Sequence, residues 1–521
     1  MPQPWWRGAV FYEVYVRSFA DADGDGIGDL PGITSRLDYI RDLGVDAIWL
    51  TPFYPSPQKD HGYDVADYYG VHPEYGTLKD FDRLLARAHE LRLRVLVDIV
   101  PNHTSDQHRW FQAALASPRS RLRRRYHFAD GREDGSPPNN WTSSFSGPAW
   151  SREPNGKQWF LHLFAPEQPD LNWWDPSVPA EFEKILRFWL DRGVDGFRID
   201  VASALYKRKD LADRPYTTDR ITGERRMDSA FPILDQPQLH DVYRRWRQIA
   251  NGYQPDRVLV GEIFEPRGHS KYIVPDQLHM AFAIIHQRWD ATRWRRSIDT
   301  SRHALHGPGS DPTWTLANHD VVRTVTRLGG GGAGQARARA ALLLVLGLPG
   351  QVFLYQGEEL GLEQVDVPKR ARQDPWFVRS GGRIKGRDGC RVPMPWRRGR
   401  RHAGFSRKAP WLPMPPGWDR LAVDVQEASG ASMLSHFRRA LAARREIASR
   451  LQGSFCWLAA PAGVLAYRRG HLIVACNFRQ LPVRLPIEGR LLLASDPRVD
   501  RRHGLLELPA NSAVWLSSVA G

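Results

Sequence analysis

Short apolar runs alternate with amphipathic helical patterns along most of the chain. Helical patterns such as Lys79 to Leu91 and Val178 to Asp191 separate runs that are rich in β-branched and aromatic residues. Eight runs are predicted as strands: Ala9 to Tyr15, Ala47 to Leu50, Val95 to Val100, Gly196 to Ile199, Val258 to Glu262, His279 to Ala283, Thr313 to Ala317 and Gln351 to Tyr355. Because strands joined by helices form parallel sheets, eight of them predict an α/β fold closed as a (β/α)₈ TIM barrel. A doubly wound sheet is the alternative.

Two stretches depart from this alternation and predict further domains. Residues 104–172 are too long for a strand-to-helix connection and rich in Gly, Pro, Ser, Asn and Trp, so we expect an inserted subdomain B after the third strand. Residues 451–521 contain short alternating runs and predict a C-terminal all-β sandwich. Residues 1–103 and 173–450 would then form the barrel. The run from Gly329 to Gly334 predicts a flexible loop.

Composition excludes several classes of protein. The 521 residues carry a formal net charge of +15, but the basic residues gather on no single element and accompany no nucleic-acid-binding motif, so we expect no nucleic-acid partner. Three distant cysteines encode neither a disulfide framework nor a zinc site. No secretory leader and no apolar run of membrane-spanning length is present, which predicts a cytoplasmic protein without membrane contact. The oligomeric state stays open.

Polar residues directly follow four of the predicted strands. His103 follows the third strand, Asp200 the fourth, Glu262 the fifth, and His319 with Asp320 the seventh. In a (β/α)₈ barrel the carboxyl ends of all strands open onto one face, where active sites lie. The sequence therefore predicts that these side chains meet in one pocket.

Carboxylates on neighbouring strands suit retaining hydrolysis of a glycosidic bond. That reaction needs a nucleophile and an acid/base roughly 5 to 5.5 Å apart, and Asp200 and Glu262 take these roles in our interpretation. Arg198 is predicted to keep Asp200 ionised, since it lies two residues earlier on the same strand face. Asp320 would stabilise the positively charged sugar of the transition state, and His103 would donate to a hydroxyl.

The segments that end these strands resemble those of the α-amylase superfamily of glycoside hydrolases, over nearly the whole chain. The matching segments are Asp98 to His103, Gly196 to Asp200, Gly261-Glu262 and Asn318 to Asp320, and Gln168 to Trp173 is similar to the oligo-1,6-glucosidase and α-glucosidase branch. The resemblance implies the same three catalytic roles. It further implies that His103, Arg198 and His319 bind glucose.

The same resemblance implies a pocket closed behind one terminal glucose. Tyr63 corresponds to the aromatic platform, Asp60 to the carboxylate that holds the far hydroxyls, and Arg387 to its arginine partner. Phe164 resembles an aromatic wall of the pocket, with a subdomain core residue as the other interpretation. A closed pocket admits only chain ends, so we expect exo-action.

A loop after the first strand places oxygen ligands at alternate positions. Asp21, Asp23, Asp25, the Ile27 carbonyl and Asp29 provide hard ligands, but the Glu that an EF-hand requires is missing. The resemblance implies a structural Ca²⁺ or Mg²⁺ ion here, distant from the chemistry. A polar turn without an ion is the alternative. No organic cofactor is expected.

The sequence gives conflicting indications of which glycosidic linkage is cleaved. Val201 after the nucleophile is associated in this branch with α-1,6 cleavage, whereas Asp235 to His240 resembles maltose-cleaving members. We expect a small α-glucoside or oligosaccharide as substrate, with α-1,4 slightly favoured, as in maltose and short malto-oligosaccharides. Oligo-1,6-glucosidase, transglucosylase, trehalose synthase and sucrose hydrolase activities stay open. A non-catalytic carbohydrate-binding relative is disfavoured because all three carboxylates are present.

Overall fold

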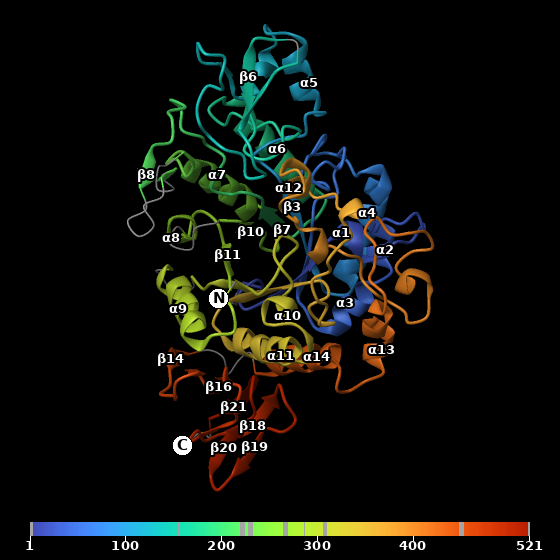
Figure 1. Ribbon diagram of the computed structural model, residues 1–521, viewed down its shortest axis with the longest axis vertical. Coiled ribbons are helices and arrows are strands. Elements are labelled where there is room, and N and C mark those ends of the chain that lie inside the picture. Colours follow the sequence, from blue (N-terminus) through green and yellow to red (C-terminus); the bar gives the residue numbers. More distant parts are fainter. Residues whose placement is uncertain are drawn as a thin grey trace.

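The computed structural model describes residues 4–154, 156–218, 225–227, 233–263, 269–285, 287–305, 310–447 and 453–518. Eight parallel strands form a closed barrel in the order β1-β13-β12-β11-β10-β7-β3-β2 (Figure 1). These strands are β1 (Val10–Val14), β2 (Ala47–Leu50), β3 (Arg94–Ile99), β7 (Gly196–Ile199), β10 (Val258–Gly261), β11 (Met280–Ile284), β12 (Thr313–Thr315) and β13 (Gln351–Tyr355). The predicted (β/α)₈ barrel is confirmed.

Helices alternate with the strands, and most of them cover the outside of the barrel, whereas α12 (Pro375–Arg379) lies near the subdomain (Figure 1). They are α1 (Val16–Phe19), α2 (Leu30–Thr34), α3 (Leu37–Leu43), α4 (Leu78–Glu90), α6 (Ser177–Asp191), α7 (Leu239–Asn251), α8 (His269–Tyr272), α9 (Ala291–His303), α10 (Thr324–Arg327), α11 (Gly331–Gly347), α12 (Pro375–Arg379), α13 (Val423–Glu427) and α14 (Met433–Glu446). A capping box of Thr77 and Asp80 starts α4. The loop predicted over Gly329 to Gly334 is wrong from Gly331 onward, because α11 begins there.

Alternate residues of the barrel strands face opposite sides. Phe11, Trp49 and Leu96 belong to the cluster inside the barrel, whereas their neighbours pack in the larger cluster under the helices. The same alternation turns Glu13 on β1, Asp98 on β3 and Arg198 on β7 toward the interior at its carboxyl end. The register confirms that Asp98 and Arg198 are direct neighbours on adjacent strands.

The segment between β3 and α6 forms a separate small unit, at the top of Figure 1. It contains α5 (Arg109–Ala116) and a three-stranded sheet ordered β4-β6-β5, from β4 (Phe128–Asp130), β6 (Gln158–Leu161) and β5 (Trp150–Arg152). Trp141, Trp150 and Leu161 form its apolar core. A hairpin of β8 (Tyr216–Thr218) and β9 (Arg225–Met227) follows β7.

The chain ends in two antiparallel sheets, at the bottom of Figure 1. One has the order β14-β15-β16-β21-β18 and the other β17-β20-β19. Their strands are β14 (Phe455–Trp457), β15 (Val464–Arg469), β16 (Leu472–Asn477), β17 (Val483–Leu485), β18 (Arg490–Ala494), β19 (Asp500–Arg502), β20 (Leu505–Leu508) and β21 (Ser512–Ser517). The two sheets share one hydrophobic cluster, as predicted for a sandwich. Within the described ranges, none of the helices has the length and apolar character needed to cross a bilayer.

Candidate active site

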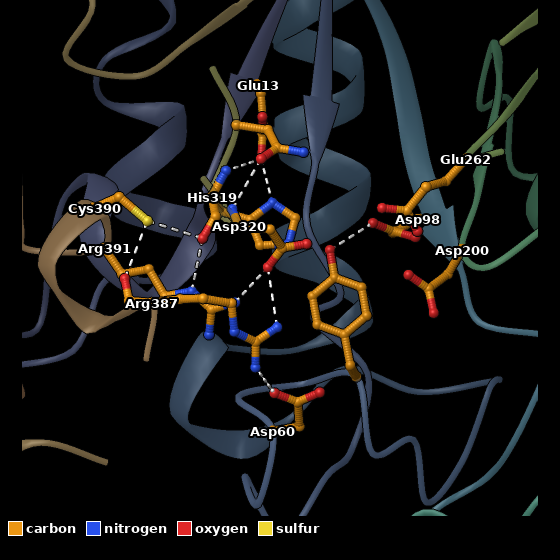
Figure 2. A network of polar contacts seen from close by, with 12 residues as sticks. Glu13, Asp60, Asp98, Asp200, Glu262, His319, Asp320, Arg387, Cys390 and Arg391 are labelled. Carbon is orange, nitrogen blue, oxygen red and sulfur yellow. Dashed lines mark hydrogen bonds and ion pairs between the residues drawn. The ribbon is translucent and has the colours of Figure 1, made fainter. Parts of the chain in front are cut away.

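Arg198 contacts three carboxyl groups at the carboxyl end of the barrel, those of Asp98, Asp200 and Glu262. Figure 2 shows that these three carboxyl groups lie close together. Nη1 of Arg198 lies 2.7 Å from Oδ1 of Asp200 and 3.0 Å from Oδ1 of Asp98. Its Nη2 lies 2.9 Å from Oε2 of Glu262. The structure therefore brings the two predicted catalytic carboxyl groups onto opposite arms of one guanidinium.

Three buried carboxyl groups share one cation, Arg198, and the pKa values of Asp98 and Asp200 are shifted. Burial raises the pKa of Asp200 well above its usual value. The charge of Arg198 acts in the opposite direction, and the neighbouring carboxyl groups of Glu262 and Asp98 raise the pKa further. Burial likewise raises the pKa of Asp98. The Arg198 charge thus lowers the pKa of Asp200, whereas desolvation raises it. That Arg198 keeps Asp200 ionised stays a prediction.

The residue after the nucleophile has a strained backbone. Val201 adopts φ +45°, a region that β-branched residues rarely populate, and its side chain is buried. This conformation lets the Val201 N–H donate to Oε2 of Glu262 at 3.1 Å. The turn after β7 therefore links the nucleophile to the acid/base through the main chain.

A second charged cluster lies across the pocket, around Arg387 (Figure 2). The Arg387 guanidinium contacts Asp60 at 2.6 Å, Asp374 at 2.6 Å and Asp320 at 3.0 Å. Arg391 adds a contact of 2.8 Å to Asp320. The ion pair expected between Asp60 and Arg387 is therefore present, and it also holds Asp320.

The pKa of Asp320 is shifted in the opposite direction to that of Asp200. Burial favours a raised pKa at Asp320, but Arg387 and Arg391, which contact its carboxylate, outweigh burial and lower the pKa below its usual value. Burial lowers the pKa of His319 well below its usual value, so the imidazole is neutral and the arginines are the cations that act on Asp320. The arginines consequently favour the ionised form of Asp320.

Aromatic rings fix the floor of the pocket. The Tyr63 ring stacks on His319 with centroids 5.3 Å apart and an angle of 12°, and its hydroxyl donates to Asp98 at 3.0 Å. Tyr15 stacks on His319 at 5.6 Å. Both the ring and the hydroxyl group of Tyr63, the predicted platform residue, are thus held in place.

The segment that carries the branch resemblance closes one side of the pocket. The amide of Gln168 lies 3.2 Å from Oδ2 of Asp60 and 3.1 Å from Nε2 of His103. Burial lowers the pKa of His103 to about 4, so the imidazole is neutral. Asp170 forms a buried ion pair of 2.8 Å with Lys207. This pair ties the inserted subdomain to the loop after β7.

Phe164 lies at the edge of this pocket. Its ring is 5.2 Å from that of His103 and 5.5 Å from that of Phe145, and it is only partly buried. It also packs against the apolar core of the subdomain, in agreement with the second interpretation, while its role as a wall of the glucose pocket stays a prediction. Phe145 and Trp376 flank the Arg387 guanidinium at 5.0 and 5.3 Å. Together these rings form an apolar wall beside the second cluster.

The predicted metal loop brings three of its ligands together. Carboxylate oxygens of Asp21, Asp23 and Asp29 lie within 4.8 Å of one another. Burial raises the pKa of Asp29, and the neighbouring Asp21 adds to this effect. Asp25 lies outside this group, and its carboxylate accepts the Ile27 N–H at 2.8 Å. A crowded set of hard oxygen donors fits a divalent cation.

Several residues of the site were not among the predicted functional residues. Glu13 and Asp98 are acidic residues inside apolar strands, and the period of two could have assigned them to the interior face. Asp374 and Arg391 come from irregular segments without a periodic pattern. Only the fold shows that they hold Arg387 and Asp320.

Comparison with known proteins assigns the chain to a family. A family model described as alpha amylase, catalytic domain, matches residues 13–453, and a domain of unknown function, DUF3459, matches residues 453–515. A "Probable alpha-glucosidase" of Rhizobium meliloti (strain 1021) is 40% identical over 486 residues, which cover 90% of this chain and 87% of that protein. An oligo-1,6-glucosidase of Parageobacillus thermoglucosidasius is 32% identical, covering 98% and 97%. The solved structure of an alpha-glucosyl transfer enzyme, XgtA, matches with a TM-score of 0.92 and 39% identity, covering 99% and 100%.

Proposed function

The chain belongs to the alpha-amylase family of glycoside hydrolases, and we propose that it is an exo-acting, retaining α-glucosidase. One observation carries the proposal: Arg198 holds Asp200 and Glu262 together at the open end of the barrel. Retention needs two carboxyl groups that act on one glycosidic bond. Asp200 and Glu262 come from neighbouring strands, β7 and β10, and both are almost fully buried.

The reaction proceeds in two displacements. The carboxylate of Asp200 attacks the anomeric carbon while Glu262 gives its proton to the leaving oxygen, and a covalent glucosyl-enzyme forms. Water then attacks the same carbon, Glu262 accepts its proton, and Asp200 leaves. Arg387 and Arg391 favour the ionised form of Asp320. The carboxylate of Asp320 then stabilises the positive charge that develops on the sugar ring.

The second cluster supports action at chain ends. Asp60 is 3% exposed and paired with Arg387 at 2.6 Å, so the pair closes the side of the pocket opposite the Arg198 cluster. A sugar with a further residue on its non-reducing side would meet this ion pair. The enzyme would therefore remove single glucose units.

Substitution of the nucleophile tests the chemistry. Asp200→Asn keeps the volume and removes the attacking charge, so turnover should fall by several orders of magnitude while the melting temperature stays near that of the wild type. The anomer of released glucose, followed by NMR, should initially be α. Release of β-glucose, or normal rates in the variant, would refute the assignment.

The linkage is tested with a panel of maltose, isomaltose, sucrose, trehalose and a nitrophenyl α-glucoside. We propose α-1,4 cleavage, because Asp235 to His240 resembles maltose-cleaving members, although Val201 favours α-1,6. A higher kcat/KM for isomaltose than for maltose would reverse this order. Random internal cleavage of long starch would contradict exo-action.

Transfer of glucose to another sugar is the second candidate. It is favoured by the likeness to XgtA, whose structure is titled an alpha-glucosyl transfer enzyme. Such a reaction uses the same glucosyl-enzyme and differs only in the acceptor that replaces water. Oligosaccharides longer than the substrate would appear at high maltose concentration, whereas a strict hydrolase releases only glucose.

We also propose that Asp21, Asp23 and Asp29 hold a Ca²⁺ or Mg²⁺ ion. The bound ion would link the loop after α1 to the start of α2, because the Asp29 side chain also caps that helix by accepting the Gly32 N–H. It would stabilise the fold without entering the reaction. Metal analysis of the purified protein tests this proposal.

A further inference from the structure

Glu13 is a buried carboxyl group that the proposed reaction does not use. It lies on β1, is 1% exposed and faces the interior of the barrel beneath the pocket. Its Oε1 accepts the backbone N–H of His319 at 3.3 Å and lies 2.5 Å from Nδ1 of the same residue. Figure 2 shows Glu13 on one side of the His319 ring and Asp320 on the other.

The second nitrogen of His319 is unpaired. Nε2 is buried and has no hydrogen-bond partner in the part of the chain that the structure describes. It lies 3.4 Å from Oδ2 of Asp320, but the two atoms are not aligned for a hydrogen bond. Buried polar atoms are nearly always paired, so an unpaired one beside a catalytic group calls for a ligand.

The ring cannot turn to satisfy Nε2 elsewhere. Tyr15 and Tyr63 stack on His319 with centroid distances of 5.6 and 5.3 Å, and Trp49 contacts it edge-on at 5.9 Å. The contact of Nδ1 with Glu13 fixes which nitrogen faces the pocket. Packing and the carboxyl group thus determine one orientation of the imidazole.

We propose that Glu13 is a positioning residue that fixes His319 as the tautomer protonated on Nδ1, so that a bare Nε2 faces the pocket and accepts a sugar hydroxyl. A neutral imidazole carries a single N–H. The Oε1 atom of Glu13 already accepts one N–H from the His319 backbone, and the same oxygen accepts the second from Nδ1. The inference rests on the proposed function, which places a sugar in this pocket.

Two hydrogen-bond acceptors then lie side by side. Nε2 of His319 and Oδ2 of Asp320 are 3.4 Å apart with no hydrogen between them, and both become satisfied only by donors from a ligand. A terminal sugar with two neighbouring hydroxyl groups supplies such donors. The site therefore selects for an intact hydroxyl pair and rejects analogues that lack one member, since the unpaired acceptor is then buried.

Two substitutions separate this role from simple packing. Glu13→Gln keeps an acceptor oxygen for Nδ1–H, and Glu13→Leu removes it while filling similar space. In ¹⁵N-histidine NMR spectra, with the His319 signals assigned through a His319→Gln variant, Nδ1 should carry the proton in the wild type. A proton on Nε2 of the wild type would overturn the proposal. This measurement needs no turnover, so it stands even if the enzyme does not cleave glucosides.

Kinetics with a series of single-deoxy α-glucosides provide the second test. For the parent glucoside, Glu13→Leu should lower kcat/KM roughly 10- to 100-fold, and Glu13→Gln about threefold or less. The loss in Glu13→Leu should disappear for the one deoxy analogue that lacks the hydroxyl bound by Nε2. An equal loss on every analogue would show a packing role and refute the proposal. A wild type without activity on any glucoside would instead refute the proposed function. If Glu13→Leu does not fold, the NMR spectrum decides alone.

Discussion

Replacement of Asp60 by Asn tests the grip on the terminal sugar. Asp60 is 3% exposed, its Oδ1 pairs with Arg387 at 2.6 Å, and its Oδ2 accepts from Gln168 at 3.2 Å. Asn has the same shape and can still accept from Arg387. The substitution therefore removes the charge and leaves the pocket closed.

The size of the effect follows from the loss of charge-assisted hydrogen bonds. A hydrogen bond to a charged group contributes about 1.5–3 kcal/mol and a neutral one about 0.5–1.5 kcal/mol. If two sugar hydroxyls donate to Asp60, the two hydrogen bonds together would contribute about 2–3 kcal/mol less binding free energy in the variant. This loss lowers kcat/KM roughly 30- to 150-fold. Arg387 keeps Asp374 and Asp320, but the Asn amide nitrogen would face the buried Gln168 donor, so the free energy of unfolding should fall by about 1–3 kcal/mol.

The assay compares kcat/KM for maltose and isomaltose in Asp60→Asn, with urea unfolding as the stability measurement. Asp82→Asn is the matched control, because Asp82 pairs with Arg192 at 3.1 Å on the surface. The control should retain wild-type kinetics. Unchanged kcat/KM in Asp60→Asn, on every substrate of the panel, would show that Asp60 does not touch the sugar.

Three further predictions concern stability. Lys207→Met leaves the fully buried Asp170 without its cation and should lower the free energy of unfolding by about 3–5 kcal/mol in urea, whereas a loss below about 1 kcal/mol would contradict a structural role for the pair. Burial lowers the pKa of His127 to about 3, so the unfolded chain binds a proton below pH 6.5 that the folded chain does not, and stability falls as the pH drops. Between pH 7 and 5 the wild type should lose about 2 kcal/mol more than His127→Gln in urea unfolding, and equal losses would refute this. A chelator should lower the melting temperature of the wild type but not of Asp21→Asn; no response in the wild type would argue against the ion.

The strands were predictable because a barrel strand is buried on both faces. Runs such as Val95 to Val100 are apolar except for Asp98, and the predicted boundaries of this run agree with β3 within one residue. The glycine run was misread because glycine has a low helix propensity. At Gly334 a Cβ atom would lie 2.4 Å from the Val325 carbonyl oxygen, so close packing of α10 and α11 requires glycine there. Propensity alone cannot show such a contact.

The residues of the candidate site that follow strand ends could be predicted from the sequence. Three of the site residues come at or just after the ends of apolar segments: Asp200, Glu262 and Asp320. A barrel brings these strand ends together on one face. Asp374 and Arg391 lie in segments without any period, so their positions depend on how the loops after β13 fold back onto the barrel. The ion pairs that hold Asp320 could therefore be found only in the structure.

The two charged clusters divide the pocket by function. Around Arg198, one cation contacts three carboxyl groups, and burial raises the pKa of the Asp200 carboxyl group well above its usual value. Around Arg387, two arginines keep the pKa of Asp320 low, so this half stays negative when positive charge develops on the sugar. The two clusters therefore shift the pKa values of their acids in opposite directions, and such shifts are typical of a site whose carboxyl groups have different roles.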